Sequence, residues 1–100
     1  MVKVVTGEEV QKEKGLILVD FYADWCGPCR MLGPLIEELS EEIPEVKFLK
    51  VNIDNEREFA INNRINSIPT IVIFKNGVEQ ARRVGFVAKS DLKKWIDNYI

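Results

Sequence analysis

The sequence predicts an α/β fold, in which a central mixed sheet of about five strands is flanked by about four helices. Two observations lead to this prediction. Short apolar runs of strand length alternate with segments whose apolar residues recur at helical spacing. Asn76-Gly77 then separates two strand-like runs by two residues, which is typical of a hairpin. The first three strands are therefore expected to be parallel, and the C-terminal hairpin should add an antiparallel pair.

Strands are expected where an apolar run is bounded by polar residues. These runs cover residues 2–5, 16–23, 46–53, 71–74 and about 79–84. The run over 16–23 is nearly continuous and contains a single charge, Asp20, which predicts a central strand buried on both faces. The last run carries Gln80, Arg82 and Arg83, as expected of a sheet edge that is protected against pairing with another chain.

Helices are expected between these strands, each with a recognisable start. Thr6 opens a capping-box pattern for a short first helix, and Asn55 is the expected cap of a helix over about 56–64. The long helix after the central strand should begin near Pro28. Its apolar spacing continues beyond Pro34, which should therefore kink the helix rather than end it. The last helix presents one apolar face made of Leu92, Trp95, Ile96 and Tyr99.

Composition excludes several classes of function. With 100 residues, 46% of them hydrophobic, we expect a single domain over residues 1–100 with a core of its own. A net charge of -2 without a basic stripe argues against nucleic-acid binding. Because we find neither a membrane-length apolar run nor a secretory signal pattern, we expect a cytoplasmic protein that does not enter membranes. The chain has no histidine and two cysteines, which excludes Cys-His nucleophiles and four-thiolate metal sites within one chain.

Both cysteines lie in Cys26-Gly27-Pro28-Cys29, where the central strand passes to its helix. On a first helical turn, residues three apart lie on one side, and their Cα separation is near the ~5.5–6 Å of an unstrained disulfide. The first sulfur would lie beside the unpaired N–H groups of the helix start. These groups favour its thiolate, the form that attacks disulfides. The second sulfur, one turn inward, is expected to be more shielded.

Two other interpretations of the pair are a structural disulfide and half of a zinc site. A structural bridge over so short a loop would constrain the unfolded chain little, and such bridges are rare in reducing compartments. Half a zinc site would need a second chain. A phosphatase-type loop is excluded because Leu32, not arginine, stands six residues after Cys26. We therefore interpret the pair as redox-active.

The residues around the pair resemble a known family. Residues 19–31, with Trp25-Cys26-Gly27-Pro28-Cys29 among them, resemble the signature of the thioredoxin family. Further matching segments are Pro34, Lys50-Val51-Asn52-Ile53-Asp54, Ile68-Pro69-Thr70, Phe74-Lys75-Asn76-Gly77 and Val84-Gly85. The resemblance runs from about residue 16 to the last residue. It implies the thioredoxin fold and the exchange of electrons with disulfide bonds in other proteins.

The resemblance also implies roles for four residues of the redox site. Cys26 matches the exposed attacking cysteine and Cys29 the buried resolving cysteine. Asp20 matches a buried carboxylate that relays a proton for the resolving thiol. An acid among apolar neighbours is costly to bury without a purpose, which favours this role over a strand residue that reaches water. Lys50 matches a lysine near that carboxylate, and a merely solvated strand lysine is the alternative.

A flat apolar surface for target proteins is implied as well. Pro69 matches a cis-proline beside the cysteine pair, although only about 5–6% of X–Pro bonds in folded proteins are cis. A target peptide would lie extended along the backbone of Ile68. Burial in the core is the alternative for Ile68 and Phe86. The matching surface residues are Trp25, Gly27, Pro28, Ile68, Gly85 and Phe86.

Some positions depart from the family pattern. Tyr22 replaces a common tryptophan, Arg30 a common lysine, and Ser67 a glycine that often precedes the isoleucine. Phe86 is bulkier than the usual alanine, and the segment before Leu16 is shorter than usual. None of these changes touches the thiols, but Arg30, Ser67 and Phe86 could alter the choice of partner.

The sequence thus predicts a general protein-disulfide reductase that acts as a monomer and carries no cofactor. By resemblance, its reducing partner is thioredoxin reductase, a flavoenzyme that draws on NADPH. One alternative keeps the fold and reverses the electron flow, as in an oxidant or isomerase of an exported compartment. Gly27-Pro28 is the pairing of reductases in this family. The other alternative is a binding subunit whose partner contacts matter more than its thiols.

Overall fold

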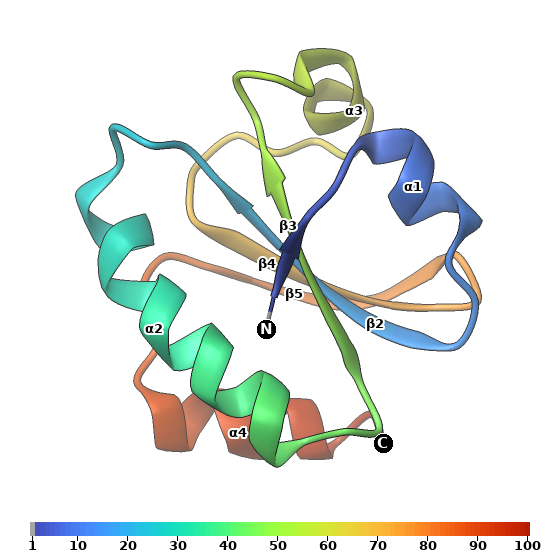
Figure 1. Cartoon of the computed structure of the whole chain (residues 1–100), viewed down its shortest axis with the longest axis vertical. Helices are drawn as coiled ribbons and strands as arrows, with labels where there is room; N and C mark the ends of the chain where they lie inside the picture. The colour runs from blue at the N-terminus through green and yellow to red at the C-terminus, as the bar shows by residue number, and fades with distance from the viewer. Residues whose placement is uncertain (1) are drawn as a thin grey trace.

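The chain folds as a central sheet with helices on both sides (Figure 1). The structure is a computed structural model that describes residues 2–100. Its strands are β1 (Lys3–Val4), β2 (Leu16–Tyr22), β3 (Lys47–Asn52), β4 (Thr70–Lys75) and β5 (Val78–Val84). Its helices are α1 (Gly7–Lys12), α2 (Gly27–Glu42), α3 (Arg57–Asn62) and α4 (Lys89–Asp97).

The sheet has the strand order β1-β3-β2-β4-β5. Strands β1 and β2 both pair with β3 in parallel, while β4 pairs antiparallel with β2 and β5 antiparallel with β4. This mixed sheet confirms the predicted arrangement of a parallel N-terminal half and an antiparallel C-terminal hairpin. The hairpin turns at Asn76 and Gly77, whose φ angles of 50° and 83° are the positive values that such a turn requires.

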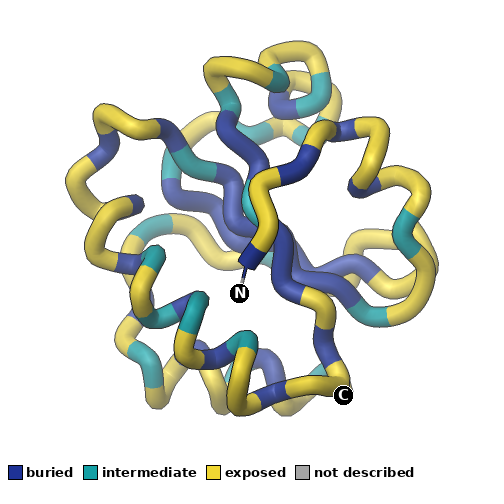
Figure 2. The backbone as a smooth tube through the Cα atoms, in the orientation of Figure 1, coloured by how far each residue is buried: buried dark blue, intermediate teal, exposed yellow. Residues whose placement is uncertain are grey.

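Two separate cores fill the space between the sheet and its helices. One core lies under α2 and α4 and contains Leu18 of β2, and the other lies under α1 and α3 and contains Val19 and Phe21 of the same strand. Strand β2 is buried over most of its length, as the dark blue path through the middle of Figure 2 shows. The prediction of a central strand buried on both faces is therefore confirmed.

The helix starts are partly as predicted. The capping box of Thr6 and Glu9 forms at the start of α1, and α2 continues through Pro34 to Glu42. The predicted cap at Asn55 is wrong, because α3 begins after Glu56 and no side chain caps it. Asn55 lies inside a turn instead, because the backbone N–H groups of Asn55 and Glu56 both donate to the carbonyl of Asn52. The Glu56 carboxylate accepts a hydrogen bond of 2.8 Å from the backbone N–H of Gly7 at the start of α1.

The final helix packs on the first core as its apolar pattern predicts. Leu92 and Ile96 are fully buried, and Trp95 and Tyr99 pack against the same core while partly exposed. Across residues 2–100, no helix has both the length and the apolar character needed to cross a lipid bilayer.

Candidate active site at the start of helix α2

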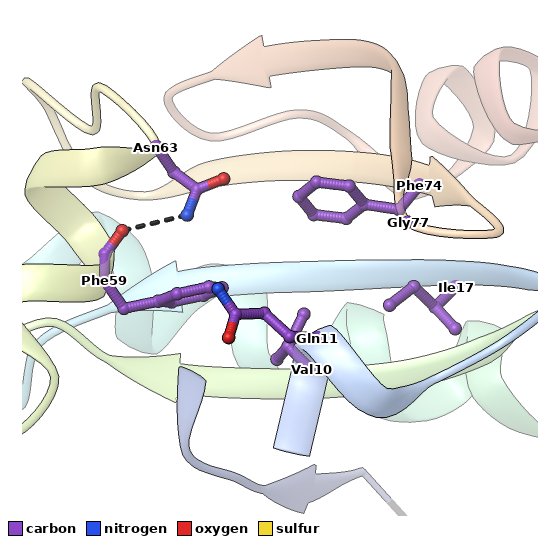
Figure 3. Close-up of a pocket in the computed structure, with 7 residues that line it drawn as sticks. All are labelled: Val10, Gln11, Ile17, Phe59, Asn63, Phe74 and Gly77. Carbon is purple, nitrogen blue, oxygen red and sulfur yellow. Dashed lines mark hydrogen bonds between the residues drawn. The ribbon is translucent and has the colours of Figure 1, made fainter. Parts of the chain in front are cut away.

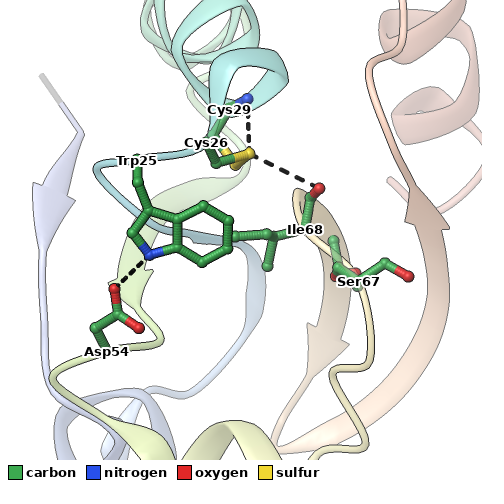
Figure 4. The surroundings of a disulfide bond; sticks show 7 residues. Trp25, Cys26, Cys29, Asp54, Ser67 and Ile68 are labelled. Carbon is green, nitrogen blue, oxygen red and sulfur yellow. Dashed lines mark hydrogen bonds between the residues drawn. A yellow bond between two sulfur atoms is a disulfide. The ribbon is translucent and has the colours of Figure 1, made fainter.

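The two cysteines lie where the central strand β2 passes to α2. Cys26 is the N-cap of the helix and Cys29 is its third residue, so that both side chains emerge from the first turn. They form a disulfide in this structure, with a Cα–Cα distance of 5.3 Å (Figure 4). The disulfide shows that the two sulfurs reach one another from this turn, as the spacing predicts.

The surroundings of the two sulfurs differ. The backbone N–H of Cys29 donates a hydrogen bond of 3.2 Å to Sγ of Cys26, which takes the place of an N-cap oxygen. The same sulfur lies 3.8 Å from the carbonyl oxygen of Ile68 (Figure 4). In the reduced protein, the helix N–H group and the positive end of the helix dipole would stabilise a thiolate at Cys26.

The expected difference in exposure between the cysteines is not observed. Both residues are 5% exposed, so the exposed-versus-buried description is wrong for the oxidised protein at the level of whole residues. The physical reason is that both cysteines form one buried cluster with Ala23, against which the partly buried Tyr22, Ile53 and Ile68 pack. Their asymmetry lies in hydrogen bonding, because Cys26 receives the helix N–H whereas Cys29 provides it.

Asp20 lies in the middle of β2 and is completely buried. Neither of its carboxylate oxygens has a hydrogen-bond partner among the described residues. Burial disfavours the charged carboxylate and raises the pKa of Asp20 to about 6, while the positive charge of Lys50 opposes this shift. The alternative of a solvated strand residue is therefore wrong for Asp20.

Lys50 is the neighbour of Asp20 in the pairing of β2 with β3. Its Nζ lies 4.4 Å from the centroid of the Tyr22 ring, a cation–π contact that holds the ammonium at this edge of the site. Tyr22, Cys29, Arg30 and Lys50 line one shallow hollow beside the start of α2. Lys50 thus lies opposite Asp20 in the strand pairing, and it also lines the hollow that reaches Cys29.

Exposed apolar side chains surround the pair on its outer side. Trp25 is 66% and Phe86 is 45% exposed, which excludes burial in the core as the explanation for Phe86. Gly27 and Pro28 are exposed beside them, and Ile68 is half-buried. The structure therefore brings the residues of the expected target surface to the same end of the sheet as the cysteines.

The segment opposite the cysteines has a special backbone. The Ile68–Pro69 peptide bond is cis, as the resemblance implies. The carbonyl oxygen of Pro69 accepts a hydrogen bond of 2.8 Å from the backbone N–H of Gly85, whose φ of 89° favours glycine. This bond fixes the proline next to the end of β5.

One contact at the site was not expected from the sequence. The indole N–H of Trp25 donates a hydrogen bond of 2.8 Å to the carboxylate of Asp54, which holds the exposed ring in place (Figure 4). The Asn52 side chain accepts the backbone N–H of Asp54 at 2.9 Å and forms the turn that presents this carboxylate. The available signal was the Asn-x-Asp pattern that begins at the last residue of a strand, because asparagine often forms such side-chain turns.

A second pocket lies elsewhere, between α1, α3 and the β4–β5 hairpin (Figure 3). Its apolar wall consists of Val10, Ile17, Phe59 and Phe74. None of these residues belongs to the redox site, so the pocket takes no part in the thiol chemistry. Among residues 2–100, no cluster of carboxylate and thiol side chains could hold a metal ion.

Comparisons with known proteins agree with this geometry. The sequence model of the thioredoxin family matches residues 3–98. The chain belongs to the thioredoxin family. It is 49% identical to a thioredoxin of Rickettsia bellii over 93% of this chain and 90% of that protein. It is 45% identical to a thioredoxin of Chlamydia pneumoniae over 99% of both chains.

Solved thioredoxin structures have the same fold. The thioredoxin of Fasciola hepatica superimposes with a TM-score of 0.89 at 37% identity, and all of both chains is covered. The thioredoxin of Plasmodium falciparum gives a TM-score of 0.90 at 34% identity over 99% of this chain and all of that one. This chain is thus a thiol–disulfide oxidoreductase, a redox carrier whose Cys26–Cys29 pair acts on disulfides in other proteins.

Proposed function

We propose that this member of the thioredoxin family is a general protein-disulfide reductase in which Cys26 attacks the target and Cys29 resolves the complex. The main support is the position of Cys26 at the N-cap of α2, where the N–H of Cys29 already points at its sulfur. In the first step the Cys26 thiolate attacks one sulfur of the target disulfide. A mixed disulfide forms, and the other target sulfur leaves as a thiolate that takes up a proton.

In the second step the thiol of Cys29 gives up its proton and attacks Sγ of Cys26. The bond between Cys26 and the target breaks, and the second target sulfur leaves and is protonated. Two electrons have then passed to the target, and the protein is left with its own Cys26–Cys29 disulfide.

Asp20 is proposed to accept the proton of Cys29. A carboxylate with a pKa of about 6 is a better base near neutral pH than an ordinary aspartate and still ionises there. Lys50 is proposed to support the charged form of this carboxylate, because its positive charge lowers the pKa of Asp20 against the effect of burial. The hollow lined by Cys29 and Lys50 would supply the water through which the proton moves.

Target proteins are proposed to bind across the apolar surface beside Cys26. An extended peptide would lie against the half-buried Ile68, and its disulfide would face Sγ of Cys26. The residues that we assign to this surface are Trp25, Gly27, Pro28, Ile68, Pro69, Gly85 and Phe86. This assignment is supported by the exposure of Trp25 and Phe86 on one end of the sheet.

Each cycle ends with an oxidised protein, so the cycle needs an electron donor. We propose thioredoxin reductase, a flavoenzyme that uses NADPH, a monomeric state in solution, and the cytoplasm as the compartment. A reductase can turn over only where an external donor keeps its dithiol reduced, and this condition favours a reducing compartment. The reduction potential of the pair distinguishes this direction from an oxidant or isomerase, because each ~30 mV changes the exchange equilibrium by about 1.4 kcal/mol.

The two cysteine variants test the proposed roles. Cys29→Ser should accumulate disulfide-linked complexes with a protein substrate such as oxidised insulin, because attack still occurs and resolution cannot. Cys26→Ser should trap little and reduce nothing. The complexes are counted on non-reducing gels after equal incubation of both variants. Equal trapping by the two variants would show that the attacking and resolving roles are wrongly assigned.

A further inference from the structure

Strand β5 has one residue more than β4, which produces a β-bulge in their pairing. This bulge determines on which face of the sheet the side chains of Glu79 and Arg82 lie. The pairing shifts at Gln80, which is left without an opposite residue on β4. Such a bulge turns the side chains that follow it relative to the regular alternation. As a result Glu79, opposite Phe74, and Arg82, opposite Val72, lie on the same face of the sheet although they are three residues apart.

The guanidinium of Arg82 is bound on two sides. Its Nε and Nη2 donate to the two carboxylate oxygens of Glu79 at 2.8 and 2.7 Å, which is a two-point ion pair. Nη2 also donates to the backbone carbonyl of Asn63 at 2.9 Å, and Nη1 donates to that of Arg64 at 3.2 Å. Glu79 therefore orients Arg82, and Arg82 binds the chain just after α3.

The two carbonyls belong to an unusual helix end. Arg64 has a φ of 55°, the left-handed conformation that normally favours glycine. The N–H groups of Arg64 and Ile65 donate to the carbonyls of Ile61 and Ala60, the pattern of a Schellman turn with a non-glycine residue at its centre. The side chain of Asn63 donates to the Phe59 carbonyl on the inner side (Figure 3). The left-handed conformation is unfavourable for Arg64 because it is not glycine. The hydrogen bonds from Arg82 to the Asn63 and Arg64 carbonyls therefore stabilise the turn from outside.

The segment that starts at this turn leads to the target-binding surface. Five residues after Asn63 it reaches Ile68, which faces Sγ of Cys26, and then the cis-proline. The far end of the segment is held by the bond from the Gly85 N–H to the Pro69 carbonyl. Strand β5 and the glycine directly after it thus hold both ends of residues 63–69, through Arg82 at the start and Gly85 at the end.

We propose that Arg82 is a positioning residue that holds the backbone of Ile68 in the conformation that binds extended target peptides. The bulge determines the face on which Arg82 lies, and Glu79 orients its guanidinium. This proposal rests on the proposed function, because it concerns the surface on which a protein substrate binds. Arg82 does not touch the cysteines, so a small disulfide that reacts with Cys26 without lying along the segment should not depend on it.

Arg83 provides a matched control. It is the same residue type on the same strand, but its guanidinium points to the opposite face and stacks on Trp95, 5.9 Å from the ring centroid. The variants are Arg82→Gln, Glu79→Gln and Arg83→Gln. Insulin with dithiothreitol as electron donor reports on protein substrates. A single turnover of the prereduced protein with 5,5′-dithiobis(2-nitrobenzoic acid) reports on thiol reactivity.

Arg82→Gln should raise the KM for insulin by about three- to tenfold and leave kcat within about twofold, the scale expected of a residue that acts through another. Glu79→Gln should change KM in the same direction by less, and Arg83→Gln should match the parent. The small disulfide should react equally with all four proteins. An unchanged insulin KM in Arg82→Gln, an equal loss on both substrates, or the same rise in Arg83→Gln would overturn the proposal.

Hydrogen exchange separates this proposal from the proposed function. The backbone amides of residues 65–68 should exchange faster in Arg82→Gln than in the parent and stay unchanged in Arg83→Gln. Unchanged exchange in Arg82→Gln contradicts the positioning role, even if the parent protein reduces insulin well. A parent that fails to reduce insulin contradicts the proposed function, whereas faster exchange confined to Arg82→Gln and Glu79→Gln still supports the role of Arg82. If Arg82→Gln does not fold, the KM for insulin and the hydrogen exchange of residues 65–68 are measured on Glu79→Gln instead. Unchanged values in that variant would then contradict the positioning role.

Discussion

Asp20 is a buried acid whose ionisation lowers the stability of the folded state. Its carboxylate is buried in the central strand, and neither of its oxygens has a hydrogen-bond partner within residues 2–100. Desolvation raises its folded-state pKa to about 6. Below its ordinary pKa both the folded and the unfolded state hold the proton, and Asp20 carries no ionisation penalty. As the pH rises from there to about 6, the unfolded state ionises first, and the folded state loses stability.

Asp20→Asn should therefore be more stable than the parent at pH 8. The gain should be roughly 1–3 kcal/mol at pH 8 and should shrink toward pH 4, because asparagine cannot ionise. Denaturant titrations of the oxidised proteins at both pH values measure this difference. The same variant should resolve mixed disulfides more slowly in stopped-flow reduction, while the initial attack by Cys26 changes less. A stability difference independent of pH would contradict the raised pKa, and undiminished resolution would contradict the proton relay.

At this scale the sequence predicted the redox site well and its surroundings incompletely. One acid in an apolar run and a pair of cysteines at a strand–helix junction are local patterns, and both lie where they were expected. The hydrogen bond from Trp25 to Asp54 joins residues 29 positions apart. The equal exposure of Cys26 and Cys29 depends on packing against residues from other segments. Contacts of this kind leave no periodic signal in the sequence.

Among the elements, α1 and α3 are joined by a contact that needs the smallest side chain. Gly7 is buried at the start of α1, and a Cβ added there would overlap with Cβ, Cγ and Cδ1 of Phe59. The N–H of the same glycine donates to Glu56, next to the start of α3. The backbone of α1 can thus approach α3 closely only because residue 7 has no side chain.

Gly7→Ala should destabilise the fold by about 1–3 kcal/mol, since the rigid Phe59 ring must move to accept the methyl group. Gly27→Ala is the control, because a Cβ at Gly27 meets nothing within 4 Å. We expect that variant to stay within about 0.5 kcal/mol of the parent. Urea titrations of the oxidised proteins measure both values. Equal stabilities of the two variants would show that α1 does not pack on Phe59 as closely as described.

The elements also show where local sequence patterns fail. The capping box at Thr6 involves neighbours three residues apart and is predicted, whereas Glu56 precedes α3 without capping it and its carboxylate binds Gly7, 49 residues away. The bulge at Gln80 is equally hidden. The exposed part of β5 has no strict alternation of apolar and polar residues, so the sequence could not show which arginine faces α3.

For the whole molecule, the two cores share one sheet. Leu18 of β2 belongs to the core under α2 and α4, and its neighbour Val19 belongs to the core under α1 and α3. Strand β3 alternates in the same way between Phe48 and Leu49. Loss of either core would therefore remove the packing of the same central strands on one face of the sheet. This interdependence is the physical reason to propose that the chain behaves as a single domain.

The proposal predicts one cooperative unfolding transition. In a Trp25→Phe background, Trp95 is the remaining tryptophan and reports on α4, while far-ultraviolet circular dichroism reports on the whole chain. The two signals should give coincident midpoints, the usual test of two-state unfolding in a domain of this size. Leu18→Ala and Val19→Ala each remove buried methyl groups from a different core. Each should lower the free energy of unfolding by about 1–5 kcal/mol and so lower the midpoint that both signals report. A Val19→Ala variant in which circular dichroism changes before Trp95 fluorescence would show that the core under α1 and α3 unfolds on its own.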